Sequence, residues 1–401
     1  MQFTNGSIYW REKNKINKTY PYLTCNTQCD VIIIGGGITG AITGYFLAKE
    51  GFDIIIAEKN ILGYGSTLAS TALLEYQLDL NMYKLEKMIG ENTAKKIYRL
   101  CLDAIDKLEK INEEFNKQTK FKRQDCLYYS NRFMQKSNMS KEYDLRKKAG
   151  FDAIFLEKHN TINLNSAIFT KDASAVLDPY EFTQNLFEYL NSLENVSVYE
   201  NTEIVNIEPR YENVICKTNN DFNILSKNVI FTSGINTLKY LNIPIDIYQK
   251  FVIVTKPLEK IKNLNLSFTA RDTSEPYHNI RFTDTGRIIF SGEDVKLNDR
   301  RLDSKYIEAI SKNKYKRLLS TMEKTFCNID EMDIEYAFNG TCPMTRDTLP
   351  LIDEIPNMPN CFCNLCFGNN GILYSVIGAD ILKDAMKGFY TKDMRSFKIN
   401  R

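Results

Sequence analysis

The sequence predicts an α/β protein, α+β overall, in which a Rossmann-like domain is interrupted by an inserted domain built on an antiparallel sheet. Three observations predict this fold. A glycine-rich strand–helix–strand unit occupies residues 30–58, strand-like runs dominate residues 247–294, and a buried-strand run followed by an apolar helix occupies residues 362–387. Pieces typical of a nucleotide-binding domain thus stand at both ends of the chain, and the strand-rich part is inserted between them.

The strand–helix–strand unit begins with β-branched apolar residues at 31–34, a run typical of a strand buried in a parallel sheet. Residues 42–49 are expected to form a helix that Gly51 ends, and residues 53–57 a second buried strand. Glu58 stands at the end of that second strand. This order of elements, with a glycine-rich turn between the first strand and the helix, predicts the βαβ unit that binds dinucleotides.

The glycines of that turn follow the G-x-G-x-x-G spacing at Gly35, Gly37 and Gly40. Gly35 is expected to make the tight turn, Gly37 to let the backbone approach a pyrophosphate, and Gly40 to let helix and strand pack closely. The open helix N-terminus supplies N–H groups and a positive dipole end to the phosphates. Glu58 is expected to accept a hydrogen bond from a ribose hydroxyl. A glycine motif by itself is weak evidence for nucleotide binding. Here it stands in register with both strands and the terminal acid, and this combination favours nucleotide binding over a chance turn.

The later elements follow from their periodicity. Apolar residues recurring every three or four positions predict an amphipathic helix over about residues 90–115. Asp178 and Pro179 are expected to begin another helix, which runs through Leu190. Residues 1–24 contain the only tryptophan and are expected to pack on the body as an arm. The remaining strand-like runs are 196–199, 203–208, 214–218, 229–234, 247–255, 279–283, 286–291 and 362–367, and the remaining helical stretches are 304–324 and 371–387.

Length and composition fit a globular protein of about two domains, with 401 residues, 43% of them hydrophobic and 25% charged. A net charge of +2 does not favour nucleic acid or an anionic membrane as a partner. No run of about 18 apolar residues is present, so no membrane span is expected. The polar N-terminus lacks a secretory segment, and a cytoplasmic location is therefore expected.

The ten cysteines are expected to be structural. Cys361, Cys363 and Cys366 lie close together, but a metal or iron–sulfur site needs four soft ligands, and the chain offers no clean second pair. We interpret this cluster as a buried strand in which cysteine serves as a small hydrophobic residue. No metal is expected, and disulfides are not expected in a reducing compartment.

A second segment rich in glycines and hydroxyls, residues 62–71, follows Glu58 closely. Glycines, hydroxyls and a following N-terminus together make a second loop that can approach a phosphate or a ring. The alternative is an ordinary surface turn. A Rossmann unit that binds only NAD has no need of such a loop directly after the ribose acid, which favours a larger cofactor contact.

With these residues in view, the chain resembles the FAD-dependent oxidoreductases of the D-amino-acid oxidase family, which include glycine oxidase and sarcosine oxidase. Four segments carry the resemblance, namely residues 30–58, 63–71, 339–353 and 367–375. The third matches the family's W-x-G-x-R-P-x-T-x-D-x-x-P-x-I-G pattern at Gly340, Pro343, Thr345, Asp347, Pro350 and Ile352. The fourth resembles a G-x-x-x-N-G-I signature before the last expected helix, with Asn370, Gly371 and Ile372 at its end. These motifs are specific for fold and cofactor, and much less so for substrate.

The resemblance implies an FAD-binding Rossmann-like domain with an inserted antiparallel-sheet substrate domain. FAD-binding pieces are expected at 1–88, including the arm 1–24, at 161–240 and at 336–401, and substrate-domain pieces at 89–160 and 241–335. The implied cofactor is FAD. The residues implied to contact it are Gly35, Gly37, Ile38, Thr39, Gly40, Glu58, Lys59, Gly65, Ser66, Thr67, Ser70, Thr71, Val205, Ser233, Gly234, Gly368, Asn369, Asn370, Gly371 and Ile372.

The segment from Gly368 to Ile372 is implied to lie beside the flavin pyrimidine. A reduced flavin is an anion, and backbone N–H groups at a helix N-terminus stabilise that charge. The alternative is a strand-to-helix turn that binds no ligand.

Cys342 stands where members of the family that oxidise amino acids carry an arginine for the substrate carboxylate. A cysteine cannot make the bidentate pair that a guanidinium makes with a carboxylate. Either Arg281 serves instead, or the substrate is not a simple α-amino acid; Arg281 could equally be a surface strand residue. His278 is a candidate pocket residue, with a structural histidine as the alternative. Sarcosine oxidases attach FAD through a cysteine, but the residues around Cys342 differ from theirs, so FAD is expected to bind non-covalently.

The sequence therefore predicts an FAD-dependent oxidoreductase that oxidises the C–N bond of a small amine or amino acid by hydride transfer to the flavin. The catalytic candidates are Arg281, Cys342 and His278, and the electron acceptor is O2 or another carrier. Two alternatives remain open: a dehydrogenase of a hydroxy acid or polyol phosphate, and a flavin-binding subunit without turnover.

Overall fold

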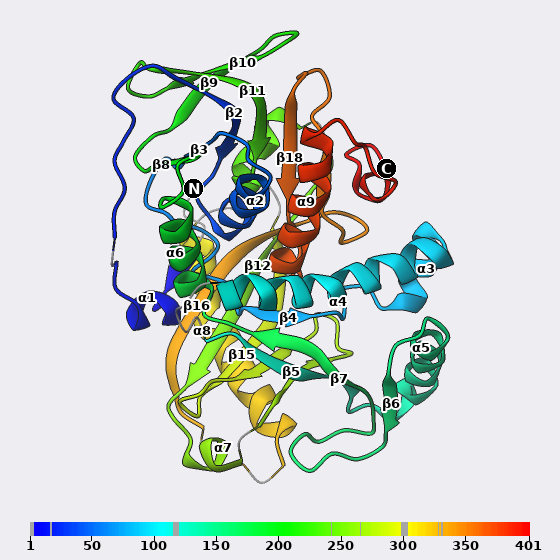
Figure 1. The fold of residues 1–401 in the computed structure, drawn as a ribbon. Helices are drawn as coiled ribbons and strands as arrows, with labels where there is room; N and C mark the ends of the chain where they lie inside the picture. The colour runs from blue at the N-terminus through cyan, green and yellow to red at the C-terminus, as the bar shows by residue number, and fades with distance from the viewer. Residues whose placement is uncertain are drawn as a thin grey trace.

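Two sheets organise the described part of the chain, as the computed structural model shows (Figure 1). The structure describes residues 4–16, 18–114, 120–241, 243–264, 266–297, 304–327, 329 and 332–401. Residues 1–3 and 17 of the expected N-terminal arm lie outside this range. The sheet in the upper half of Figure 1 contains segments from the beginning, middle and end of the chain, side by side.

This nucleotide-side sheet has a parallel centre. In it β2 (Thr27–Ile34) lies between β3 (Ile54–Ala57) and β11 (Asn223–Phe231), and β11 continues to β18 (Cys361–Leu365). The outer strands are β8 (Val196–Tyr199), parallel to β3, and β17 (Leu351–Glu354), β10 (Val214–Thr218) and β9 (Ile204–Pro209), which pair antiparallel. Three helices pack on one face of this sheet: α2 (Ile38–Lys49), α6 (Pro179–Leu190) and α9 (Gly371–Met386).

The apolar run at the start of the βαβ unit explains why β2 is central. Val31, Ile32 and Ile33 are each 0% exposed. Val31 and Ile33 join the core under α2, α6 and α9, while Ile32 joins the core on the opposite face. Burial on both faces is what a continuous β-branched run favours in a parallel sheet.

The second sheet is mainly antiparallel and lies in the lower half of Figure 1. Its path of strands is β1 (Thr4–Gly6), β16 (Ile334–Met344), β12 (Asp246–Thr255), β15 (Ile288–Leu297), β14 (Asn279–Phe282), β13 (Phe268–Asp272), β5 (Lys122–Ser130), β7 (Ser166–Val176) and β4 (Leu73–Glu75), with β6 (Ala153–Leu156) paired to β7. The helix α8 (Ser304–Thr325) covers one face, where Leu318 and Met322 pack with Phe251 and Phe290. Because strand side chains alternate between faces, the neighbouring residues of β12 and β15 point to the opposite face.

The helix α4 (Glu91–Glu114) crosses between the two sheets and contacts α9, β4 and β7 (Figure 1). Its buried residues recur every three or four positions, from Ala94 to Ile111. The smaller elements are α1 (Tyr9–Lys13), α3 (Met82–Ile89), α5 (Lys136–Lys148) and α7 (Glu259–Leu264), with 3-10 turns at Phe133–Gln135, Gly234–Tyr240 and Asp393–Phe397.

The α/β fold class predicted from the sequence is confirmed, as are the amphipathic helix at about 90–115 and the helix that begins at Asp178. Asp178 caps α6, because its Oδ1 accepts hydrogen bonds from the backbone N–H groups of Tyr180 and Glu181, both at 3.1 Å. The helix α2 starts at Ile38, before the expected residue 42, because the second half of the glycine turn already forms its first turn.

The strands alternate between the two sheets more often along the chain than the domain ranges expected from the sequence imply. The strand β16 belongs to the second sheet, although its residues fall mostly in the range 336–401 expected for the FAD-binding domain. The strand β7 belongs to the second sheet as well, within the expected range 161–240. The domain ranges therefore stay predictions.

The N-terminal arm packs on the body, as expected. Its strand β1 pairs with β16, and the indole Nε1 of Trp10 donates a hydrogen bond to the carbonyl of Ser70 at 2.7 Å. The ten cysteines are free thiols. Within the described ranges no cluster of His, Cys, Asp or Glu could hold a metal ion. None of the helices in that part of the chain combines the length and apolar character that a membrane span needs.

Candidate active site

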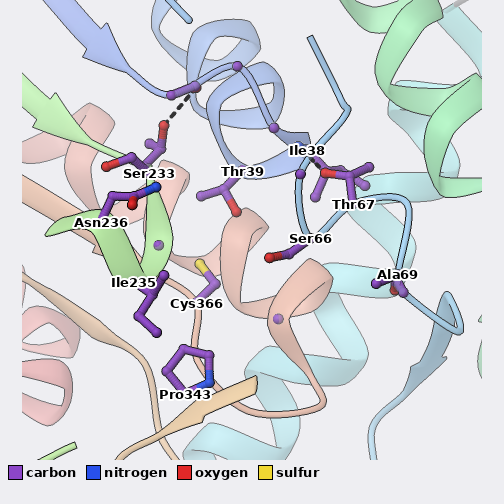
Figure 2. Close-up of a pocket in the computed structure, with 18 of the residues that line it drawn as sticks. Ile38, Thr39, Ser66, Thr67, Ala69, Ser233, Ile235, Asn236, Pro343 and Cys366 are labelled. Carbon is purple, nitrogen blue, oxygen red and sulfur yellow. Dashed lines mark hydrogen bonds between the residues drawn. The ribbon is translucent and has the colours of Figure 1, made fainter. Parts of the chain in front are cut away.

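A cavity of about 750 Å³ lies between the nucleotide-side sheet and the open face of the second sheet. This volume is in the range of cofactor and ligand sites. Figure 2 shows residues from both ends of the chain around one space: Ser233 and Asn236 on one side, Ser66 and Thr67 on the other, Thr39 and Cys366 between them, and Pro343 below.

The first wall of the cavity is the glycine turn that leads into α2. Gly35 has φ of +121°, and a Cβ built there would lie 2.9 Å from the backbone nitrogen of Ser233. Both facts require glycine. Gly37 caps α2 without a side-chain hydrogen bond, and the N–H of Ile38 donates to Thr67 Oγ1 at 3.1 Å. The N-terminus of α2 thus faces the cavity next to hydroxyl groups of the loop 62–71, and its N-cap residue Gly37 has no side chain that could close it.

Glu58 lies at the edge of the same wall, where the strand β3 ends. Its Oε2 accepts from the N–H of Gly36 at 2.7 Å, and its Oε1 accepts from the N–H of Asn60 at 2.9 Å. Burial raises the pKa of the Glu58 carboxyl above its ordinary value of 4.5, against the lowering effect of these two N–H groups. A buried carboxylate at this place is suited to accept hydrogen bonds from vicinal hydroxyls of a ribose.

Replacing Glu58 by glutamine is expected to weaken FAD binding about tenfold or more, because hydrogen bonds to a charged acceptor are lost. The apoprotein should respond in the opposite direction. A raised folded-state pKa gives stability that is present below about pH 4.5 and is lost as the pH rises through that pKa. The melting temperature of the Glu58→Gln apoprotein relative to wild type should therefore rise between about pH 4 and about pH 7. Unchanged FAD affinity would contradict the role given to Glu58.

The second wall is the N-terminus of α9. Asn370 caps this helix without a side-chain hydrogen bond to it, because its Nδ2 donates instead to the carbonyls of Glu75 at 2.8 Å and Gln77 at 3.0 Å. The first N–H groups of a helix have no intrahelical partner. Gly371 and Ile372 line the cavity, so this helix also presents the positive end of its dipole there.

The third wall is the open face of the second sheet. Val252 of β12 pairs with Ser291 of β15, which pairs in turn with Asn279 of β14, and all three line the cavity in one cross-strand row. Lys250 precedes Val252 by two positions and faces the same side. The pairing of β12 with β15 shifts register between Gln249 and Phe251, where β15 carries one extra residue opposite Lys250. The bulge therefore lies on β15, and Lys250 keeps the regular alternation of β12.

Lys250 brings a buried positive charge to this wall. Its side chain is 17% exposed, and its Nζ lies 2.9 Å from Asp294 Oδ2 and 5.3 Å from the centre of the Tyr277 ring. Burial alone would lower the pKa of the Lys250 ammonium, but the carboxylates of Asp294 and Asp79 outweigh it and hold that pKa above its ordinary value. The group is therefore an ammonium at neutral pH.

Cys342 lines the cavity beside this lysine, on the strand β16. Burial raises the pKa of its thiol to about 11. The residue is thus a protonated thiol near neutral pH, which makes it a poor nucleophile.

Most residues expected to contact the cofactor line the cavity. They are Gly35, Gly37, Ile38, Thr39, Glu58, Lys59, Gly65, Ser66, Thr67, Ser70, Thr71, Ser233, Gly234, Gly368, Asn369, Gly371 and Ile372. The structure does not bring Gly40, Val205 or Asn370 to the lining. Gly40 lies behind the turn, Val205 is 49% exposed, and the Asn370 side chain points to the backbone before Asp79.

Arg281 does not line the cavity, although it lies on the same face of β14 as Asn279. Its Nη1 donates to the carbonyls of Thr71 at 2.8 Å, Ala72 at 3.0 Å and Leu177 at 2.9 Å, and its guanidinium stacks over Trp10. Arg281 lies two residues beyond Asn279 on the strand, where the arm and the turn at 70–72 cover it. Arg281 thus supports the loop beside the cavity and does not reach the wall.

His278 alternates with Asn279 and therefore faces the other side of the sheet. Its ring stacks on Phe290 with centroids 5.4 Å apart, and its Nδ1 lies 2.8 Å from Asp272 Oδ2. This placement fits a structural role of His278 better than a role in the pocket.

Lys250, Asn279 and Ser291 were missed by the sequence reasoning. Their alternation along strand-like runs was visible, but which alternate residues face a ligand depends on the pairing of β12, β14 and β15. The one signal in the sequence was a lysine inside the strand-like run at 247–255.

One cavity thus combines two helix N-termini, a buried carboxylate and a polar sheet face. A family model described as FAD dependent oxidoreductase matches residues 30–385, and the chain belongs to this family of FAD-dependent oxidoreductases. A protein of Bacillus subtilis designated a Rieske 2Fe-2S iron-sulfur protein, YhfW, is 26% identical over 394 residues, which are 94% of this chain and 72% of that protein.

Solved structures show the same fold. Glycine oxidase from Geobacillus kaustophilus superposes with a TM-score of 0.76 at 18% identity, covering 93% of this chain and 99% of that one. L-amino acid deaminase from Proteus vulgaris superposes with a TM-score of 0.78 at 16% identity, covering 97% of this chain and 100% of that one. At these identities the likeness concerns the fold alone.

Proposed function

We propose that this chain holds FAD in the cavity, with the ADP part on the turn from Gly35 to Thr39 and Glu58, and the flavin between the start of α9 and the wall that carries Lys250. One observation carries the proposal: a single cavity joins the N-termini of α2 and α9, neither of them closed by its N-cap side chain, to a polar sheet face. The pyrophosphate and the anionic reduced ring are the two negative groups of this cofactor, and each helix N-terminus suits one of them.

We further propose that the substrate is a small amine or amino acid whose C–N bond is oxidised. FAD, when bound, supplies the hydride acceptor. The chain's own residues bind and orient: Lys250 pairs with an anionic group of the substrate, Asn279 and Ser291 offer hydrogen bonds, and Val252 gives apolar contact. Among the described residues no histidine lines the cavity, which fits an amine that reacts in its neutral form without a protein base. The names of the glycine oxidase and the amino acid deaminase support this choice.

The alternative, oxidation of a C–O bond in a hydroxy acid or polyol phosphate, uses the same wall, because an ammonium binds carboxylate and phosphate alike. The purified yellow protein should be mixed anaerobically with amines, amino acids, hydroxy acids and glycerol phosphate while flavin absorbance is followed. We expect bleaching by an amine-bearing compound, with one ammonia or amine released per flavin reduced. Bleaching by hydroxy compounds alone would establish the alternative, and no bleaching by any of them would favour a subunit without turnover.

Electrons are proposed to leave to O2 or to a separate carrier. The described residues contain no group of His, Cys, Asp or Glu that could hold a metal ion. Free thiols throughout the chain are consistent with a reducing, cytoplasmic location.

FAD is expected to be held non-covalently. The Cys342 thiol is protonated at neutral pH, and covalent attachment needs a reactive thiolate. Acid precipitation of the purified protein should leave the yellow colour in the supernatant. Colour that stays with the pellet, and moves to the supernatant in Cys342→Ser, would show attachment at that residue.

A further inference from the structure

The carboxylate of Asp79 lies directly behind the loop that begins α9. Its Oδ2 accepts from the backbone N–H of Asn369 at 3.1 Å, and its Oδ1 accepts from the Asn369 side-chain amide at 2.7 Å. The hydroxyl of Tyr277 donates to the same Oδ1. The Asp79 side chain is 4% exposed, whereas Asn369 and Gly368 line the cavity. Only Asn369 and its neighbour Gly368 thus separate Asp79 from the proposed flavin site.

The loop is fixed at two neighbouring points. The N–H of Gly368 donates to the carbonyl of Pro343 at 3.1 Å, and the next N–H, that of Asn369, is the one on Asp79. A trans peptide directs its N–H and C=O in opposite directions, so the bond to Asp79 sets the orientation of the whole Gly368–Asn369 peptide. Gly368 has φ of +86°, and a Cβ there would lie 3.0 Å from Asp79 Oδ2, so the carboxylate is fitted closely against this loop.

Asp79 belongs to a buried network that reaches the substrate wall. Arg271 Nη1 lies 3.4 Å from Asp79 Oδ1, and Arg271 Nε lies 3.3 Å from Glu75 Oε2. The Tyr277 ring is flanked by two cations, with Arg271 at 4.6 Å and Lys250 at 5.3 Å from its centre. Burial, and next to it the charge of Asp79, raise the pKa of Tyr277, so the phenol stays protonated and keeps donating to Asp79.

We propose that Asp79 is a positioning residue that fixes the Gly368–Asn369 peptide against the flavin, and thereby sets how strongly the start of α9 stabilises negative charge on the reduced ring. This inference rests on the flavin placement under the proposed function. Asp79 acts through Asn369 and does not touch the cofactor. Arg271 and the Tyr277 hydroxyl offset its own negative charge, so we assign its effect to hydrogen bonding.

Sulfite tests this role, because it adds to the flavin and leaves the ring negatively charged. The flavin-loaded Asp79→Ala protein is expected to bind sulfite about tenfold more weakly than wild type, which corresponds to a midpoint potential about 30 mV lower for a two-electron couple. In Asp79→Asn the amide oxygen still accepts from the N–H of Asn369, and the Asn369 amide can rotate to match. This variant should stay within about threefold of wild type.

Glu142 offers a matched control. It is also a buried carboxylate that accepts backbone N–H groups, those of Met82 at 3.0 Å and Tyr83 at 3.1 Å, and it pairs with Arg146 at 2.9 Å. Neither Met82 nor Tyr83 lines the cavity. Glu142→Gln should lower the melting temperature and leave sulfite binding unchanged.

Sulfite affinity of yellow Asp79→Ala within about twofold of wild type would overturn the inference. An Asp79→Asn protein as weak as Asp79→Ala would assign the effect to charge and overturn the positioning role, and so would an equal loss in Glu142→Gln. If Asp79→Ala does not fold, Tyr277→Phe serves in its place, because it removes one hydrogen-bond donor to Asp79. Sulfite binding should then weaken about threefold. An unchanged sulfite affinity of this variant would count against the inference. A wild-type protein that binds no FAD would instead contradict the proposed function itself.

Discussion

Replacing Gly40 by alanine is expected to give a protein that purifies with little or no flavin. A Cβ at this position would lie 2.0 Å from the carbonyl oxygen of Gly35 and 3.1 Å from Thr232 Oγ1. The first contact is backbone, so the glycine turn and α2 must move apart. Overpacking of this kind costs about 1–3 kcal/mol, and if the strain falls on the pyrophosphate turn, FAD affinity drops by about tenfold to a hundredfold. The ratio of flavin absorbance to protein absorbance in the purified protein measures the outcome.

Gly44→Ala is the matched control. Gly44 lies in the same helix and does not line the cavity, and a Cβ built there would lie 2.9 Å from the Cδ1 of Ile56, the end of a side chain that can shift. This variant should retain FAD at the wild-type level. A Gly40→Ala protein that keeps its full complement of FAD would show that helix and turn need not approach as closely as the structure has them.

Replacing Lys250 by methionine is expected to raise the KM for an anionic substrate at least about tenfold, since a charge-assisted pair contributes about 1.5–3 kcal/mol. Methionine keeps most of the length and apolar stem of lysine, so packing against Tyr277 changes little. Steady-state kinetics with the amine identified by flavin bleaching supply the measurement. The kcat should change less than the KM if Lys250 binds substrate and transition state alike.

Two variants make this result specific. Lys250→Arg keeps the positive charge and should recover much of the affinity. Lys239 also lines the cavity, but from the 3-10 turn on the nucleotide side, so Lys239→Met should leave the substrate KM unchanged once FAD is saturating. Equal KM values for wild type and Lys250→Met would mean that the substrate carries no anionic group at this wall.

The cofactor half of the site could be predicted because its signals are local. The spacing of Gly35, Gly37 and Gly40 and the position of Glu58 encode one supersecondary unit, and the short run before Gly371 encodes the start of a helix. In each case residues that make the turn also line the cavity. Local sequence therefore determines both the structure and the site.

The substrate half could not be predicted because its signals are tertiary. Arg281 and Asn279 are two residues apart on one strand, and only the covering arm and the turn at 70–72 decide that Asn279 reaches the cavity. Lys250 reaches it because the pairing of β12 with β15 and β16 turns this face of the strand toward the cavity. Asp79 is linked to Asn369 across 290 positions of sequence. Sequence periodicity carries no information on contacts of this kind.

A crystal structure of the yellow protein is the most direct test of where FAD binds. We expect FAD density in the cavity, with the pyrophosphate over Gly37 and Ile38, the ribose hydroxyls on Glu58, and the flavin between Gly371 and the wall that carries Lys250. Density for FAD elsewhere, or a ring that points away from α9 and Lys250, would contradict this expectation.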